Sequence, residues 1–313
     1  MKKLYLILFS FFIIFFSIGF IIYRSISGLP SPPQNFLILG LDPRNDLLEK
    51  TETTDTIIFA HLNLSQNKIS LISFPRDLWY YPLSVKINQI FPLSLSTDSS
   101  FNFVKTNFNH LLGQNIDRVL VLTTQDLEHI INLLGGVDVY LDTGFIDKEY
   151  PNPEYIKNPT SKTPVYITIE FPAGWNKITA TNVAQFVRSR KSAQTAADGG
   201  TDLGRIQRQQ LLLQNIFQKM LTLRTQPQTL LKLFRYYQQD INTDVNKTDL
   251  VLTGAKLLPH LKSLKLEKIE LPVGNNPRTD LIYDPEKLVN GQWAFLPQDP
   301  EYLKLQEYLK NVL

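Results

Sequence analysis

Residues 186–210 begin with Phe186-Val187-Arg188-Ser189-Arg190, continue through a polar, glycine-containing loop, and end with Thr201-Asp202-Leu203-Gly204-Arg205-Ile206-Gln207-Arg208-Gln209-Gln210. Arg188 and Arg190 are two residues apart, so on an extended strand their side chains would point to the same face. The later part precedes an apolar run from Leu211 to Leu221. That run predicts the buried side of a helix whose arginines lie at its N-terminal end.

The charges of this stretch indicate an anion site. Asp202, Arg205 and Gln209 follow an i, i+3, i+7 spacing, so they share one stripe of the predicted helix. Guanidinium groups bind phosphate oxygens in pairs, and a helix N-terminus adds free N–H groups and partial positive charge. Together these features suit a diphosphate better than a single carboxylate. The alternative is a solvated basic face with local ion pairs such as Asp202 with Arg205.

The composition excludes several classes of protein and site. The chain has 313 residues, enough for one large or two ordinary domains, and its net charge of +3 is too small to favour nucleic acid. It has no cysteine, which excludes disulfides, a thiolate nucleophile and cysteine-ligated metal, and which is compatible with export. The four histidines are scattered without the spacing of a metal site.

Residues 4–23 form an uninterrupted apolar run without charge, whose length matches the roughly 30 Å hydrocarbon core of a bilayer. Lysines precede the run, so the positive-inside bias places residues 1–3 in the cytoplasm and everything after Arg24 outside. We therefore predict a single-pass cell-membrane protein with a transmembrane helix over 4–23. A cleaved signal peptide is the alternative, with a weak cleavage site at 25–27.

The rest of the chain predicts an α/β fold. Residues 24–34, rich in serine and proline, are expected to form a linker, and 35–313 one extracytoplasmic layered α/β domain with a central mixed sheet flanked by helices. Strands are predicted over 35–41, 55–64, 68–74, 118–123, 137–141, 165–171 and 266–271. Helices are predicted over 101–112, 126–134 with Thr124 as N-cap, 179–185, 227–237, 247–258 and 299–313, the last begun at Pro300, and a surface loop over 150–164.

Polar residues follow the strand predicted over 68–74. Pro75-Arg76-Asp77 comes at its end, and Lys86-Ile87-Asn88 follows soon after. Open α/β sheets carry their ligands at such strand ends. The alternatives are a local turn with an ion pair for Arg76 and Asp77, and an ordinary loop for Lys86 and Asn88.

An ordered series of short motifs carries a resemblance to a known family. The series is Asp42; Asp55-Thr56; Ser73-Phe-Pro-Arg-Asp77; Lys86-Ile-Asn88; Leu134-Gly-Gly-Val-Asp138; Phe186-Val-Arg-Ser-Arg190; and Asp202, Arg205 and Arg208-Gln-Gln210. No single motif is specific, but their order over residues 35–223 resembles the LytR–CpsA–Psr family of cell-envelope transferases. Thr53 departs from that pattern, because many relatives have arginine there; Arg44 is a candidate replacement.

The resemblance implies an enzyme that takes a glycopolymer linked to polyprenyl pyrophosphate and transfers the phospho-glycan to a peptidoglycan sugar hydroxyl. A phosphodiester forms and polyprenyl phosphate is released. The implied partners are that donor, the peptidoglycan acceptor and the membrane, without nucleic acid. The implied polymer is a teichoic acid or a capsule. Two alternatives stay open: a non-catalytic membrane-anchored binder of lipid-linked glycan or pyrophosphate, and a transcriptional regulator.

The resemblance also assigns roles to residues. It implies that Asp42 and Asp55 hold Mg²⁺, with Mn²⁺ as the alternative ion. Our own hypothesis is that Asp77 or one of the metal-site acids accepts the hydroxyl proton. The predicted catalytic residues are Arg76, Asp77 and Asp55. The predicted pyrophosphate-binding residues are Arg76, Lys86, Arg188, Arg190, Asp202, Arg205, Arg208 and Gln209. For the lipid tail we predict a channel between the sheet and the helices around 101–112 and 216–221.

Overall fold

A six-stranded mixed sheet lies at the centre of the protein, in the order β11-β6-β1-β2-β3-β12. The computed structural model describes residues 32–41, 53–96, 101–160, 162–189, 202–222 and 226–313. β1 pairs in parallel with β6 and antiparallel with β2, which confirms the mixed α/β class expected from the sequence. The strands of this sheet are β1 (Gln34–Leu41), β2 (Thr54–Asn63), β3 (Lys68–Ser73), β6 (Arg118–Thr123), β11 (Asn242–Thr243) and β12 (Lys265–Ile269).

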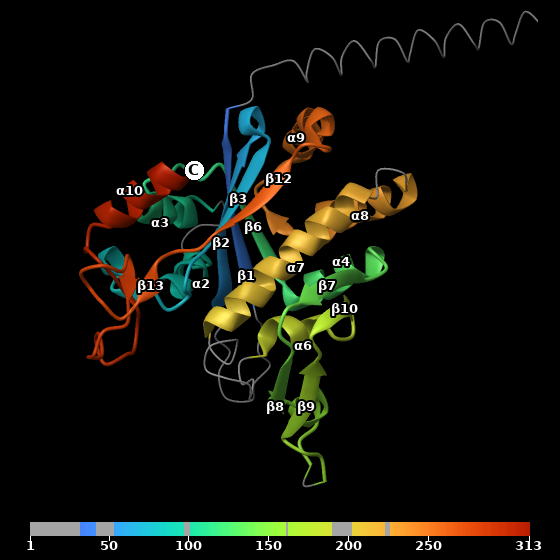
Figure 1. The fold of residues 1–313 in the computed structure, drawn as a ribbon, viewed down its shortest axis with the longest axis horizontal. Coiled ribbons are helices and arrows are strands. Elements are labelled where there is room, and N and C mark those ends of the chain that lie inside the picture. Colours follow the sequence, from blue (N-terminus) through green and yellow to red (C-terminus); the bar gives the residue numbers. More distant parts are fainter. Residues whose placement is uncertain (1–31, 42–52, 97–100, 161, 190–201, 223–225) are drawn as a thin grey trace, which may run out of the picture.

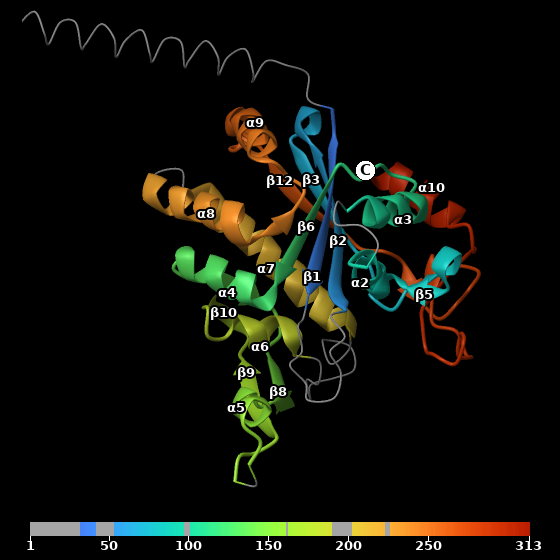
Figure 2. The same cartoon turned by 180° about the vertical axis from the view of Figure 1, so that it is seen from behind.

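Helices cover both faces of the sheet (Figures 1 and 2). On one face Leu37, Phe59 and Val119 are buried against α3 (Asn102–Leu112) and α10 (Leu303–Val312). On the other face Ile58 packs against Leu213 of α7 (Asp202–Thr222). The sheet is thus flanked by helices, as the sequence predicted, and covering both faces accounts for the near-continuous apolar runs of its central strands.

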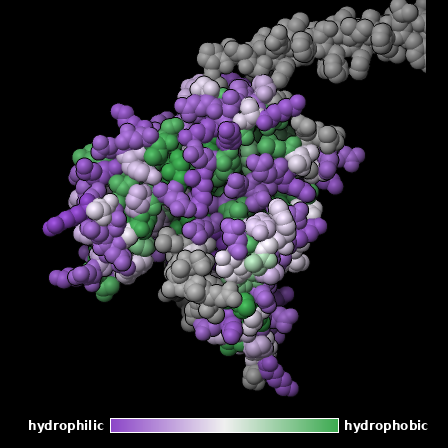
Figure 3. Space-filling model, in the orientation of Figure 1, coloured by the Kyte–Doolittle hydropathy of each residue, from purple (hydrophilic) through white to green (hydrophobic). Residues whose placement is uncertain are grey.

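A second apolar cluster lies beside α7 and joins four short strands to three helices. β7 (Val137–Leu141) pairs with β10 (Gly174–Ile178), and β8 (Phe145–Pro151) pairs with β9 (Tyr166–Phe171). The rings of Phe145, Phe171 and Phe186 pack on one another, with α4 (Thr124–Leu133) and α6 (Val183–Arg188) around them. The β8–β9 hairpin and α5 (Pro153–Lys157) form an arm whose base packs in this cluster and whose other end projects from the main body (Figure 3).

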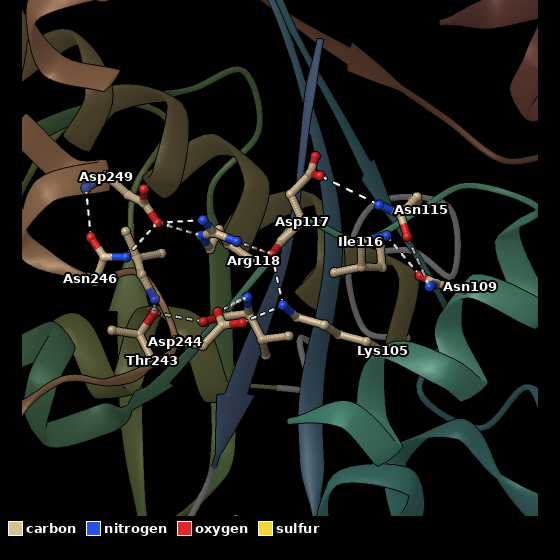
Figure 4. A network of polar contacts seen from close by, with 12 residues as sticks. Lys105, Asn109, Asn115, Ile116, Asp117, Arg118, Thr243, Asp244, Asn246 and Asp249 are labelled. Atoms are coloured by element: carbon tan, nitrogen blue, oxygen red, sulfur yellow. Dashed lines mark hydrogen bonds and ion pairs between the residues drawn. The ribbon is translucent and has the colours of Figure 1, made fainter. Parts of the chain in front are cut away.

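Two partly exposed ion pairs attach the C-terminal part to the sheet (Figure 4). Asp244 forms an ion pair with Lys105 of α3 and accepts a hydrogen bond from the backbone N–H of Val119 at 2.7 Å. Arg118 donates from Nε to Asp249 of α9 (Lys247–Leu257) at 3.0 Å.

The remaining elements are α2 (Ile90–Ser94), α8 (Pro227–Asp240), β4 (Trp79–Tyr80), β5 (Val85–Lys86), β13 (Val273–Gly274), β14 (Ile282–Tyr283), β15 (Leu296–Pro297) and 3₁₀ turns at Leu64–Gln66, Tyr81–Leu83, Ile87–Gln89 and Leu258–His260.

Three local predictions are wrong. The N-cap of α4 is Thr123, not Thr124, because the Thr123 hydroxyl accepts a hydrogen bond from the backbone N–H of Asp126 at 3.1 Å. The predicted loop 150–164 contains the end of β8 and the helix α5, which Asn152 caps and Pro153 begins. The helix predicted over 179–185 is α6 and runs from Val183 to Arg188.

The structure does not test the predicted anchor. Residues 4–23 lie outside the described residues. Among the helices that are described, none has both the length and the apolar character that a membrane span requires.

His61 gives a prediction for the pH dependence of stability. Its imidazole is buried in β2 beside the side-chain oxygen of Asn35, 2.7 Å away. Burial first, and then the charge of Lys68, lower its pKa, while Asp117 opposes the shift. Below about pH 6.5 the unfolded chain therefore binds more protons than the folded chain, and stability is lost as the pH falls toward the folded pKa.

We expect His61→Gln to flatten this pH dependence. The wild-type free energy of unfolding should fall as the pH drops below about 6.5, with a slope of up to about 1.4 kcal/mol per pH unit from this group. Urea denaturation at several pH values measures that slope. His129→Gln, at an exposed position of α4, is the matched control and should retain the wild-type slope. Equal slopes for the wild type and His61→Gln would refute the assignment.

Candidate functional site

The predicted site residues gather at one edge of the sheet. Leu41 pairs with both Thr123 and Thr54, so β1 and β6 end where β2 begins. β3 ends at the same edge, because Ser73 pairs with Ile58 of β2. A cavity of about 760 Å³ opens at this edge and extends between the sheet, α7, α4 and the β8–β9 arm.

One part of the cavity is polar. Its lining there includes Asp55, Arg188, Arg205 and Gln209. Arg205 is 2% exposed; its Nη2 donates to the backbone carbonyl of Asp55 at 3.2 Å, and its Nη1 lies 3.8 Å from the Asp55 carboxylate. The helical stripe predicted for Arg205 and Gln209 is confirmed by their shared place in the cavity wall. Guanidinium groups set in a half-enclosed wall can bind phosphate oxygens strongly, because little water screens them.

Arg76, Asp77 and Lys86 continue this network beyond the cavity wall. Nη1 of Arg76 donates to Oδ1 of Asp55, and its Nε donates to Oδ2 of Asp77 at 3.2 Å. Nζ of Lys86 donates to the other Asp77 oxygen at 2.9 Å. The structure thus connects these three residues to Asp55 through a chain of alternating charges. This series of ion pairs links residues up to 31 positions apart in sequence, from Asp55 to Lys86.

The rest of the cavity is mainly apolar. Gly40 lies where β1 approaches β2, and a Cβ atom there would come within 2.8 Å of Thr56 Cβ. The sheet, α4, α6 and α7 contribute Ile38, Leu122, Leu127, Val187, Leu212 and Leu213. The arm contributes Tyr150, Pro151, Pro153, Ile156 and Tyr166, together with the charged residues Asp147, Glu149 and Lys157. Such a wall can hold a hydrocarbon chain next to the arginines.

The cavity is not where we predicted the lipid channel. The helix around 101–112 lines none of it, because α3 packs tightly on the opposite face with α2 and α10. Residues 216–221 do not line it either; Ile216 is buried in the cluster around Phe186. The lining part of α7 lies one to three turns earlier, at Arg205, Gln209, Leu212 and Leu213.

Arg208 is placed differently from Arg205. It does not line the cavity. Its Nε donates to the carbonyl of Phe186 at 3.1 Å, and its Nη2 donates to the carbonyl of Ser189. Its guanidinium carbon lies 4.4 Å from the centre of the Phe145 ring. Burial and the neighbouring charge of Arg205 lower the pKa of Arg208 to about 10, while Asp147 opposes the shift. It remains protonated near neutral pH. Its predicted contact with pyrophosphate remains a prediction.

For three further predicted residues the structure describes no side chain. Asp42 and Arg190 lie outside the described residues, and Asp202 begins α7 without a described side chain. Arg188 is the last residue of helix α6, so the extended strand considered for Arg188 and Arg190 does not include it; Val183, Phe186 and Val187 form the buried side of α6. Arg188 nevertheless lines the cavity near Arg205, as its predicted role requires.

Sequence reasoning missed two acids of the cavity wall, Asp147 and Glu149 on β8. Asp147 is 2% exposed; its Oδ2 accepts a hydrogen bond from the Ser189 hydroxyl and its Oδ1 accepts one from the Glu149 backbone, at 2.7 and 3.0 Å. They alternate on one strand with Lys148, a pattern that also fits a solvated hairpin. The spacing alone therefore could not find them.

One of the two acids predicted to hold Mg²⁺, Asp55, lies among the described residues. They contain no group of three or more histidines or acids close enough to hold a metal. Asp55 is a described carboxylate at the polar part, and the guanidinium groups of Arg76 and Arg205 balance its charge. Mg²⁺ is usually held by one or two carboxylates together with phosphate oxygens, so this donor fits when substrate is bound.

One curated protein is similar in sequence to part of this chain. The curated transferase TagU of Enterococcus faecalis, named a polyisoprenyl-teichoic acid–peptidoglycan teichoic acid transferase, is 23% identical over 198 residues. That alignment covers 61% of this chain and 55% of TagU, so the chain spans about half the length of this curated relative.

Two solved structures resemble most of the chain. A crystal structure from Enterococcus faecalis, described as a transcriptional regulator, has a TM-score of 0.62 at 20% identity over 91% of this chain and 88% of its own. The LytR-CPS2A-psr family protein YwtF (TagT), described with bound octaprenyl pyrophosphate lipid, has a TM-score of 0.55 at 18% identity over 91% and 94%. At these identities the likeness concerns the fold alone.

A family model decides the relationship, because it extends over nearly the whole chain. The model described as the LytR_cpsA_psr family matches residues 24–311, including every described residue that forms the cavity. The chain therefore belongs to the LytR–CpsA–Psr family, as the ordered motifs predicted.

Proposed function

We propose that this protein transfers a phospho-glycopolymer from a polyprenyl-pyrophosphate carrier to a sugar hydroxyl of peptidoglycan. What supports the proposal above all is one cavity that joins buried and half-buried guanidinium groups to an apolar wall. A pyrophosphate on a long hydrocarbon chain needs both surfaces side by side. The name of TagU agrees with this chemistry, although it belongs to that relative.

The residues at the polar part would bind and orient the donor. Arg188 and Arg205 would hold the pyrophosphate oxygens, and Gln209 would add an amide donor. The acceptor oxygen forms a bond to the phosphorus that carries the glycan, and the bond from that phosphorus to polyprenyl phosphate breaks. The hydroxyl proton passes to a carboxylate, for which Asp55 and Asp77, at the ends of the strands, are the candidates. Phosphoryl transfer depends mainly on such positioning and charge neutralisation.

A divalent cation belongs to the same proposal. Asp55, with Asp42 as predicted from the sequence, would hold Mg²⁺ or Mn²⁺, and the cation would neutralise charge on the phosphate oxygens when bound. The apolar run 4–23 would anchor the protein in the cell membrane and keep the domain on the outer side. The acceptor and the lipid carrier would then be within reach of one cavity.

Removing divalent metal is expected to lower transfer about a hundredfold or more, because phosphate charge would then be neutralised by the arginines alone. The test uses the full chain in lipid nanodiscs, a synthetic polyprenyl-pyrophosphate-linked glycan and peptidoglycan fragments. The readout is released polyprenyl phosphate. Mg²⁺ or Mn²⁺ added after EDTA should restore turnover of the wild type. The same addition should raise turnover of Asp55→Asn only weakly. Binding without any release of polyprenyl phosphate under all conditions would contradict the enzyme and favour the binding module.

A further inference from the structure

The last turn of α6 is held by side chains of α7. A helix C-terminus leaves its final carbonyl groups without partners inside the helix. Here Arg208 donates to the carbonyls of Phe186 and Ser189, and the amide of Gln209 donates to the carbonyl of Val187 at 3.2 Å. A guanidinium also complements the negative end of the helix dipole. The carbonyls on both sides of Arg188 are therefore fixed by α7.

Asp147 of β8 also holds this end of α6. The hydroxyl of Ser189 donates to its carboxylate at 2.7 Å, and both residues are at most 2% exposed. Asp147 also balances the charge of Arg208, which is packed on the Phe145 ring of the same strand. Ser189 is thus bound to α7 through its carbonyl and to β8 through its hydroxyl. It directly follows Arg188, which lines the cavity.

We propose that Asp147, Ser189 and Arg208 are positioning residues that aim Arg188 at the donor pyrophosphate. This inference rests on the proposed function, because it concerns the same cavity. Arg188 is half-buried at the end of a helix of six residues, which by itself would fray. The hydrogen bonds from α7 and β8 hold this helix end in one conformation before the substrate binds. A preoriented guanidinium loses less conformational entropy on binding a phosphate.

The experiment measures two affinities of the full chain in detergent. The probes are octaprenyl pyrophosphate and octaprenyl monophosphate, each followed by the change in protein fluorescence or by calorimetry. Ser189→Ala and Asp147→Asn should weaken the binding of pyrophosphate on the order of tenfold and leave the binding of monophosphate within about twofold. Arg208→Lys should act in the same direction, because an ammonium lacks the planar fork that reaches two carbonyls. Asp142→Asn, exposed just before β8, is the matched control.

The outcomes separate the inference from the proposed function. If the wild-type protein does not prefer pyrophosphate over monophosphate, the proposed function fails. If the wild type has that preference and the folded variants keep it, the positioning role is wrong. A parallel loss of both affinities, or loss of cooperative thermal unfolding in all three variants, would also overturn the inference, because the network would then be merely structural.

Discussion

Replacing Arg76 by alanine is expected to reduce glycopolymer transfer about a hundredfold to a thousandfold while the affinity for octaprenyl pyrophosphate falls much less. Arg76 lies outside the cavity wall but is bound to both Asp55 and Asp77. Its removal leaves two neighbouring carboxylates with less positive charge at the edge where the phosphate reacts. Ground-state binding of the lipid relies instead on Arg188, Arg205 and the apolar lining.

The measurement pairs initial rates of polyprenyl phosphate release with equilibrium binding of octaprenyl pyrophosphate. Arg278→Ala, at an exposed position, controls for the loss of one positive charge and should leave both values unchanged. A fall in rate that merely matches a fall in affinity would indicate that Arg76 serves binding alone. Unchanged turnover would remove Arg76 from the catalytic set and weaken the assignment of Asp55 and Asp77.

The central strands could be predicted because burial on two faces leaves a strong local signal. β2 has buried residues at both odd and even positions, such as Phe59 and Ile58, and its apolar run is correspondingly continuous. The helix α5 left a weaker signal. Asn152 and Pro153 suggest a loop by composition, yet asparagine at the N-cap and proline at the first position also begin helices.

The site was only partly predictable, because spacing tells which residues share a face and packing decides what that face meets. Arg205 and Gln209 are one helical turn apart, and both line the cavity. Arg208 is also close to Arg205 in helical projection, but α6 packs beside it and offers carbonyl groups. Asp147 carried no such signal. Its role depends on the position of Ser189, 42 residues later in the chain.

Filling the apolar part of the cavity is expected to separate recognition of the lipid from recognition of the pyrophosphate. Leu127 lines the cavity from α4 and is not fully buried, so a tryptophan there would extend into the space. Excluding about four methylene groups of the lipid would cost about 3 kcal/mol at roughly 0.8 kcal/mol each. We therefore expect Leu127→Trp to weaken octaprenyl pyrophosphate binding on the order of a hundredfold. Inorganic pyrophosphate should bind as it does to the wild type.

Leu230→Trp, on the exposed side of α8, makes the same chemical change away from the cavity and should leave both affinities intact. Binding by calorimetry, with thermal unfolding as the test of folding, distinguishes the possibilities. Parallel loss of lipid and inorganic pyrophosphate binding would mean that the tryptophan disturbs the arginines. Unchanged lipid binding in Leu127→Trp would mean that the hydrocarbon chain lies elsewhere. On the α3 side favoured by the sequence, Val104, Phe108 and Leu111 are buried against the sheet, and no residue of α3 lines the cavity described here, so we expect the lipid to follow α7.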